Sequence, residues 1–182
     1  MFRFVAMSNE FLNKLHHVNT FMLDVDGVLT DGSVLATDTG EQLRVFNIKD
    51  GYALQLAVKK GYRIVIITGG KSPGVIKRLQ GLGITDIYSG VANKLEQFNS
   101  YIKEHQLNTE HILYMGDDIP DRAIMKQVGV PCCPKDAVGD IQQVSLYTSP
   151  KKGGKGCVRD VLEQVMKIQG KWNVEEGENL IW

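Results

Sequence analysis

The sequence of 182 residues has neither an excess of charge of one sign nor a long apolar run. Its 21 lysines and arginines balance its 21 aspartates and glutamates, so the net charge gives no indication of nucleic acid or an anionic membrane as a partner. Near the N-terminus, Phe2, Phe4 and Val5 are interrupted by Arg3, which is typical neither of a signal peptide nor of a membrane span. We therefore expect a cytoplasmic protein.

Cysteine is also scarce, and the three that occur are Cys132, Cys133 and Cys157. An odd number with two neighbours adjacent excludes a disulfide framework and paired zinc ligands, and favours buried thiols. Repeats, linkers and low-complexity segments are missing as well. Because the length suits one core, we expect a single domain over residues 1–182, with an N-terminal helix within about 1–18 and a C-terminal helix and tail over about 150–182.

Apolar runs that end in polar residues alternate with helical patterns along the chain. The run from Thr20 to Leu23 has no polar alternation, which favours a strand buried on both faces of a parallel sheet. Similar patterns predict strands over 20–23, 63–67, 86–88, 111–115 and 130–132, a hairpin of 33–36 with 42–47, and helices over 8–17, 51–60, 72–82, 94–105, 123–128, 137–144 and 157–169. This alternation predicts an α/β fold with a doubly wound, Rossmann-like parallel sheet and a β-hairpin flap after the first strand.

Polar side chains follow several of the predicted strands directly, at the sheet edge where such folds bind ligands. They are Asp24, Asp26, Thr68, Lys94, Asp117 and Asp118. Carboxylates gathered at one edge repel one another unless a hard cation lies among them, and carboxylates, a carbonyl and waters are the ligands that Mg²⁺ prefers. A lysine and a threonine hydroxyl beside that cation suit the oxygens of a phosphoryl group. Lys94 on its own is more typical of a solvated lysine in the first turn of a helix, although the helix dipole disfavours it there.

The spacing of the first two carboxylates indicates hydrolysis rather than storage of a phosphoryl group. Asp24 and Asp26 lie two residues apart, so both can approach one substrate, and a turn at Gly27 can redirect the second. Attack on phosphorus by Asp24 gives an aspartyl-phosphate, while Asp26 protonates the leaving oxygen and later deprotonates water. A turn-capping role for the pair is the plain alternative. A signalling receiver domain shares the acidic pocket but lacks the second acid.

These residues resemble the motifs of the haloacid dehalogenase superfamily, in order. The motifs are Asp24-Val25-Asp26-Gly27-Val28, Thr68 before Gly69-Gly70, Lys94, and Gly116-Asp117-Asp118 with Asp121 behind. The resemblance implies that Mg²⁺ is held by the side chains of Asp24 and Asp117 and the carbonyl of Asp26. It implies that Thr68 and Lys94 bind the transferring phosphoryl group and that Asp118 supports the loop or the metal's waters. Asp121 equally suits the first turn of a helix.

Within the superfamily, the short spacings between motifs leave no room for a cap domain. The segments Phe46-Asn47-Ile48-Lys49-Asp50-Gly51-Tyr52 and Gly153-Gly154-Lys155-Gly156-Cys157-Val158-Arg159 resemble the octulosonate 8-phosphate phosphatase family of lipopolysaccharide precursor synthesis. The resemblance implies a homotetramer with packed hairpins, a C-terminal segment that reaches a neighbour's site, and Arg78 as a ligand of the sugar acid's carboxylate, for which its planar fork is suited.

Two positions depart from that family's usual pattern. Gly70 stands where arginine is common in octulosonate enzymes and glutamate in enzymes for the nine-carbon analogue, and Asn93 stands where aspartate is usual. A phosphatase for a nine-carbon 2-keto-3-deoxy sugar acid 9-phosphate therefore stays open as an alternative. So does a non-catalytic regulatory or oligomerisation module of the same fold.

Overall fold

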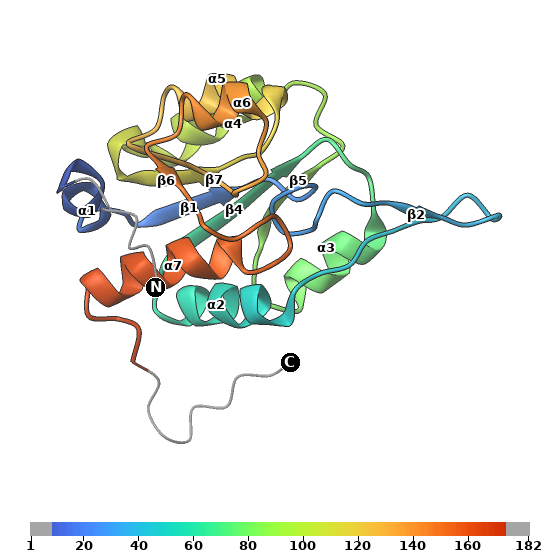
Figure 1. Cartoon of the computed structure of the whole chain (residues 1–182), viewed down its shortest axis with the longest axis horizontal. Coiled ribbons are helices and arrows are strands. Elements are labelled where there is room, and N and C mark those ends of the chain that lie inside the picture. Colours follow the sequence, from blue (N-terminus) through green and yellow to red (C-terminus); the bar gives the residue numbers. More distant parts are fainter. Residues whose placement is uncertain (1–8, 174–182) are drawn as a thin grey trace.

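A computed structural model describes residues 9–173 of the chain, and its centre is a six-stranded sheet. The strand order is β5-β4-β1-β6-β7-β8, and every neighbouring pair is parallel. Helices cover both faces of the sheet (Figure 1). The predicted doubly wound α/β fold is therefore confirmed.

The strands of the sheet are two to six residues long. Their bounds are β1 Thr20–Leu23, β4 Arg63–Thr68, β5 Asp86–Ser89, β6 Ile112–Met115, β7 Val130–Cys133 and β8 Tyr147–Thr148. All four residues of β1 and of β6 are buried, as expected for strands covered on both faces. The sequence pattern missed β8, a two-residue edge strand without an apolar run.

Two groups of helices form the outer layers. The bounds are α1 Asn9–Leu15, α2 Ile48–Lys59, α3 Pro73–Gln80, α4 Lys94–His105, α5 Arg122–Met125, α6 Gly139–Gln142 and α7 Cys157–Ile168, with 3-10 turns at η1 Thr109–His111 and η2 Ile119–Asp121. One core joins α1, α2, α3 and α7 to one face of the sheet, and a second joins α4, α5 and α6 to the other. Among the described residues, no helix has the length and apolar character needed to cross a membrane.

Capping side chains set the starts of α2 and α3, the first at a different residue from the one predicted and the second as predicted. The helix expected from residue 51 begins at Ile48, because the side chain of Asn47 accepts a hydrogen bond from the Lys49 N–H (2.8 Å) and caps it. Ser72 caps α3 by accepting from the Val75 N–H, as the Ser-Pro pair predicts. The expected cap of α1, Ser8, lies outside the described residues.

The segment between β1 and α2 forms a separate two-stranded antiparallel ribbon, β2 Leu35–Ala36 with β3 Gln42–Leu43. Both strands are shorter than the expected 33–36 and 42–47. The ribbon extends away from the body of the molecule (Figure 1). Its apolar side chains Val34, Leu35, Leu43 and Val45 are 45–77% exposed.

Helix α7 belongs to the core of this chain. Its residues Val158, Val161, Leu162 and Val165 are fully buried. The helix has no capping side chain of its own; instead Asp50 of α2 accepts hydrogen bonds from the backbone N–H groups of Gly156 (3.2 Å) and Arg159 (2.7 Å). Asp50 thereby supplies the N-terminal cap from another helix.

All three cysteines are buried and free, as predicted.

Candidate active site

The candidate site lies at the carboxyl end of β1. The chain crosses from β4 and β5 on one side of β1 to β6 and β7 on the other, so this strand marks the topological switch point, where open α/β sheets bind ligands. A pocket of about 350 Å³ opens there. It is lined by Asp24, Asp26, Gly32, Thr68, Gly69, Gly70, Lys94, Asp117, Asp118, Pro120 and Asp121.

The loop after β1 holds Asp24 and Asp26 by its backbone. The Asp24 N–H donates to the Met115 carbonyl (3.1 Å), which extends the β1–β6 pairing by one residue. Beyond it, the Val25 carbonyl accepts from the N–H groups of residues 28, 29 and 30. At Gly27 φ is +87°, and a Cβ there would lie 2.0 Å from Asp117 Oδ2. Only glycine allows both this turn and this approach.

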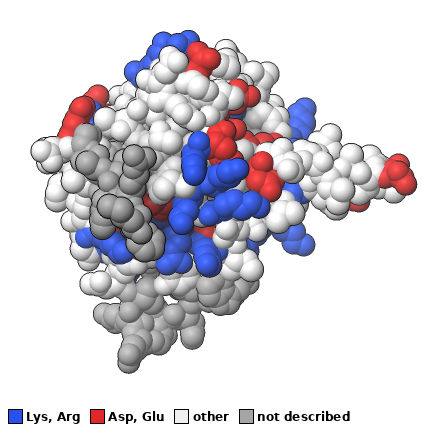
Figure 2. All heavy atoms as spheres, viewed as in Figure 1, with Lys and Arg blue, Asp and Glu red and all other residues white. Residues whose placement is uncertain are grey.

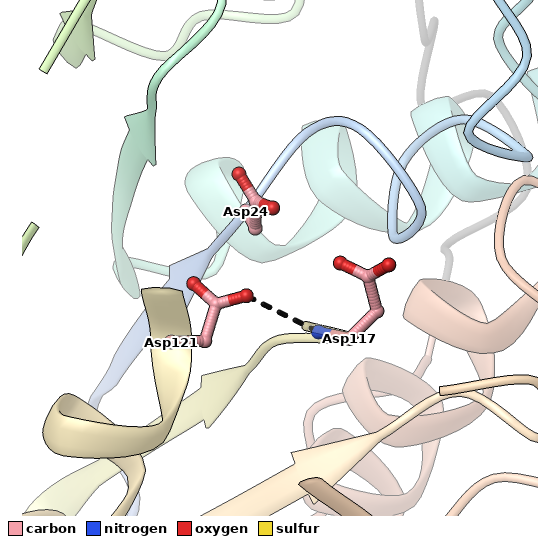
Figure 3. Close-up of side chains that lie close together, drawn as sticks. All are labelled: Asp24, Asp117 and Asp121. Carbon is pink, nitrogen blue, oxygen red and sulfur yellow. Dashed lines mark hydrogen bonds between the residues drawn. The ribbon is translucent and has the colours of Figure 1, made fainter. Parts of the chain in front are cut away.

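Three carboxylates, Asp24, Asp117 and Asp121, face one another across the pocket floor (Figure 3), with one oxygen of each within 4.8 Å of the others. Burial, followed by repulsion from Asp121, raises the pKa of Asp24 to about 6. Burial, followed by repulsion from Asp24 and Asp121, raises the pKa of Asp117 to about 7. This cluster therefore resists full ionisation unless a cation joins it.

Lys94 supplies one positive charge to the cluster. It is the first residue of α4 and is 9% exposed. Its Nζ lies 2.9 Å from Asp24 Oδ1 and 2.8 Å from Asp121 Oδ1. Burial opposes the charge on Lys94, but the two carboxylates outweigh it and raise the pKa of the ammonium. The preceding Asn93 caps α4 by accepting from the Glu96 N–H, a task that asparagine and aspartate perform equally well.

Asp121 lines the pocket, and the sequence left its role open. Its side chain makes no helix-capping bond. It is fully buried, accepts from the Tyr114 hydroxyl (2.6 Å) and the Asp117 N–H (3.2 Å), and pairs with Lys94. Asp121 does lie at the start of a helix, as the alternative expects, but its side chain contacts Lys94 and the Asp117 N–H instead of capping that helix. The spacing of four from Asp117 was the signal available, but only the fold shows that Asp121 joins Lys94 to the loop that carries Asp117.

The other predicted residues occupy different positions around the pocket. Thr68 ends β4, is buried, and accepts from the Gly70 N–H (3.2 Å). Asp118 is exposed and accepts from the Ile119 N–H (2.8 Å), so it caps the turn η2. Arg78 on α3 does not line the pocket of its own chain; its guanidinium lies against Gly51, where an added Cβ would be 2.5 Å from Nη2.

Asp26 has a partner that the sequence did not indicate. Arg44, which directly follows β3, donates from Nε to Asp26 Oδ1 (2.7 Å) and from Nη2 to Asp26 Oδ2 (3.1 Å). This hydrogen bond is the main cause that raises the pKa of Arg44. The two residues are 18 positions apart, and no periodicity or motif relates a hairpin arginine to the strand before it.

The residues present fit a magnesium ion. Asp117 Oδ1 is buried and has no hydrogen-bond partner among the described residues, and an unpaired buried carboxylate oxygen is costly unless a cation binds it. The donors available are carboxylate and carbonyl oxygens, which suit Mg²⁺ rather than softer metals.

No family model matches the chain, but individual proteins of known sequence and structure do. The 3-deoxy-D-manno-octulosonate 8-phosphate phosphatase KdsC of Escherichia coli (strain K12) is 34% identical over 174 residues, which cover 96% of this chain and 93% of that protein. The enzyme of the same name from Yersinia pestis has a crystal structure that matches with a TM-score of 0.87 and 31% identity, covering 93% of this chain and 90% of that one.

A third match carries ligands. The crystal structure of 3-deoxy-D-manno-octulosonate 8-phosphate phosphatase from Moraxella catarrhalis, in complex with a magnesium ion, a phosphate ion and a KDO molecule, has a TM-score of 0.86 and 34% identity. The match covers 89% of this chain and 93% of that chain.

Proposed function

The chain belongs to the 3-deoxy-D-manno-octulosonate 8-phosphate phosphatase family of the haloacid dehalogenase superfamily, and we propose that it hydrolyses this sugar acid phosphate with Mg²⁺ as cofactor. The observation that carries the proposal is the cluster of Asp24, Asp117 and Asp121 beside Lys94 at the switch point of the sheet. The reaction releases the free octulosonate and inorganic phosphate.

The side chains of Asp24 and Asp117, with the backbone carbonyl of Asp26, are the residues that hold the ion. When bound, Mg²⁺ neutralises charge on the phosphoryl oxygens and offsets repulsion between the carboxylates. Lys94 and Thr68 bind the remaining phosphoryl oxygens, and the buried Asp121 keeps Lys94 charged and in place. Asp118 supports the loop through its cap on η2.

The chemical work falls to the two carboxylates of the first motif. An oxygen of Asp24 attacks phosphorus, and the bond from phosphorus to the sugar oxygen breaks while Asp26 donates a proton to that oxygen. Asp26, now ionised, takes a proton from a water molecule that attacks the aspartyl-phosphate. Phosphate leaves, Asp24 regains its carboxylate and Asp26 is again protonated.

We also propose that the pocket is completed by neighbouring subunits of a homotetramer. Support comes from the exposed apolar side chains of the ribbon, Val34, Leu35, Leu43 and Val45, which would be buried if ribbons packed together. Figure 2 shows the ribbon projecting with few charged side chains. In this arrangement Arg78, which lies outside its own pocket, serves the sugar carboxylate in an adjacent subunit. Aspartate at Leu35 or Val45 would then dissociate the oligomer in light scattering.

The C-terminal tail is proposed to help enclose a neighbour's substrate, and residues 174–182 lie outside the described part of the chain. Because α7 belongs to the core, the tail must be tested by truncation after Asn173 and not before α7. An unchanged kcat and KM after that truncation would contradict this role.

Steady-state kinetics with Mg²⁺ test the substrate directly. Octulosonate 8-phosphate, nine-carbon 2-keto-3-deoxy acid 9-phosphates and simple sugar phosphates are compared by kcat/KM. We expect the octulosonate ester to be preferred. Preference for the nine-carbon esters would favour the alternative that Gly70 raises, and no turnover of any ester would favour the non-catalytic module. A cytoplasmic location and a place in lipopolysaccharide precursor synthesis are parts of the same proposal.

A further inference from the structure

The two carboxylates of the first motif have different cationic partners. Asp24 faces Lys94, which is a single ammonium shared with Asp121. Asp26 faces Arg44, whose planar guanidinium engages both of its oxygens. A lysine allows its partner to rotate, whereas a two-point arginine contact fixes the plane of a carboxylate.

The guanidinium of Arg44 is itself held in place. Its third nitrogen, Nη1, donates to the Gln42 carbonyl (3.0 Å) in β3. The side chain of Arg44 is only 6% exposed, compared with 34% for Asp26. Arg44 therefore ties the ribbon to Asp26, which lines the pocket, although Arg44 itself is not a lining residue.

Gly70 leaves the room that this link needs. A Cβ at Gly70 would lie 3.1 Å from Asp26 Oδ2 and 3.3 Å from Arg44 Nη2. A larger side chain at this position would press on both partners. The Arg44 and Asp26 pair thus fills the space beside Thr68 that Gly70 leaves open.

We propose that Arg44 is a positioning residue that orients the Asp26 carboxylate for proton transfer, so that the ribbon β2–β3 contributes to the chemical step. The proposal rests on the phosphatase activity inferred above. Arg44 engages one lone pair on each oxygen of Asp26, which leaves other acceptor positions free toward the pocket. Loss of Arg44 frees the carboxylate to rotate, so steps that need proton transfer by Asp26 slow, while attack by Asp24 on an ester whose leaving group needs no proton does not.

The test compares a leaving group that needs a proton with one that does not. For Arg44→Ala we expect kcat for the sugar phosphate to fall by about 10-fold or more, a part of the 10²- to 10⁴-fold that general acid–base catalysis contributes. Release of p-nitrophenolate in a single turnover, with enzyme in excess over p-nitrophenyl phosphate, stays within about twofold because this leaving group needs little protonation. Equal losses in both assays, or no loss in either, would overturn the proposal.

Three further comparisons distinguish orientation of Asp26 by Arg44 from a nonspecific loss of activity. Arg44→Lys keeps the charge but not the fork, so it recovers only part of the activity; full recovery would overturn the positioning role. In the Asp26→Asn background, Arg44→Ala causes no further loss, whereas additive losses would contradict a shared step. Arg63→Ala removes an arginine that pairs with Asp86 at the opposite end of β4, and it stays within about twofold of wild type.

The test of Arg44 does not depend on which phosphate ester is the natural substrate. Failure of the wild-type protein on octulosonate 8-phosphate overturns that substrate, while the role of Arg44 is judged from ratios between variants on whichever alkyl phosphate the wild type hydrolyses. The Mg²⁺ concentration for half-maximal activity stays within about twofold in Arg44→Ala, because hydrogen bonds to the Val25 carbonyl hold the backbone of this loop independently.

Discussion

Lys94 and Asp121 form a buried ion pair, with Nζ 2.8 Å from Oδ1, between the helix that follows β5 and the turn that follows β6. The pair joins two parts of the pocket that are 27 residues apart in sequence. Asp121 also accepts hydrogen bonds from the Tyr114 hydroxyl and the Asp117 N–H, so one carboxylate connects Lys94, the proposed phosphoryl ligand, to the loop of a predicted metal ligand.

Replacing this carboxylate should affect catalysis more than removing its tyrosine partner. Asp121→Asn removes the charge beside Lys94 and one acceptor of the Asp117 N–H, and we expect kcat to fall roughly 10- to 100-fold. Tyr114→Phe is the matched variant, since it removes one hydrogen bond but leaves the ion pair. It should lower the free energy of unfolding by about 1–3 kcal/mol with a smaller effect on kcat. Equal kcat in the two variants would contradict the proposed role of Asp121.

Asp24→Asn should reduce phosphate release by at least about 10³-fold, because the amide cannot form the covalent intermediate. Circular dichroism and the thermal midpoint check that the variant is folded. Turnover close to that of the wild type would show that another group attacks phosphorus.

Magnesium binding should release protons at mildly acidic pH. In the metal-free protein the pKa values of Asp24 and Asp117 are raised to about 6 and about 7, so at pH 6 both are partly protonated. Binding requires carboxylates, so affinity rises with pH through this range and roughly one proton or more is released per ion at pH 6. Calorimetry in two buffers of different ionisation enthalpy measures this number. It should approach zero above pH 8 and fall in Asp117→Asn.

Asp50 should make folding stability depend on pH. Burial is the main cause that raises its pKa from 3.8 to about 6 in the folded protein, despite two backbone N–H donors. A carboxyl group with a raised pKa favours the folded state fully below pH 3.8, and this contribution is lost as pH rises through 6. A shift of about two units corresponds to at most about 3 kcal/mol.

Asp50→Asn isolates this contribution because the amide does not titrate. The free energy of unfolding of wild type minus that of the variant should decrease between pH 4 and pH 7 in urea titrations. The pH-dependent contributions of the other ionisable groups are the same in both proteins and therefore cancel in this difference. A difference that stays constant or grows with pH would contradict the raised pKa of Asp50.

The glycine-rich segment before α7 should be intolerant of side chains where it meets the first-motif loop. A Cβ at Gly153 would lie 2.0 Å from the Gly27 carbonyl oxygen, which belongs to the backbone and cannot rotate away as a side chain could. Gly153→Ala should therefore cost about 1–3 kcal/mol and reduce activity by displacing the loop of Asp26. Gly139→Ala is the control, since nothing lies within 4 Å of an added Cβ and the residue begins α6. It should be neutral or slightly stabilising.

Local sequence patterns determined the central strands, most helices and the order of the motif residues. Buried runs such as Thr20–Leu23 specify central parallel strands, and residues that follow parallel strands must meet at one edge of the sheet. For that reason Asp24, Thr68, Lys94 and Asp117 could be assigned to one pocket before the fold was known. The start of α3 at Pro73 followed from the capping residue Ser72 directly before it in the chain.

Tertiary structure alone decided which charges pair. Arg44 reaches Asp26 because the residue that follows β3 lies beside Gly70, and Asp50 caps α7 because α2 and α7 pack together, at sequence separations of 18 and more than 100 residues. Such contacts have no periodicity and depend on the packing of whole elements, so no local pattern predicts them. The sequence determined where Asp24 and its neighbours gather, and the fold determined which cation faces each carboxylate.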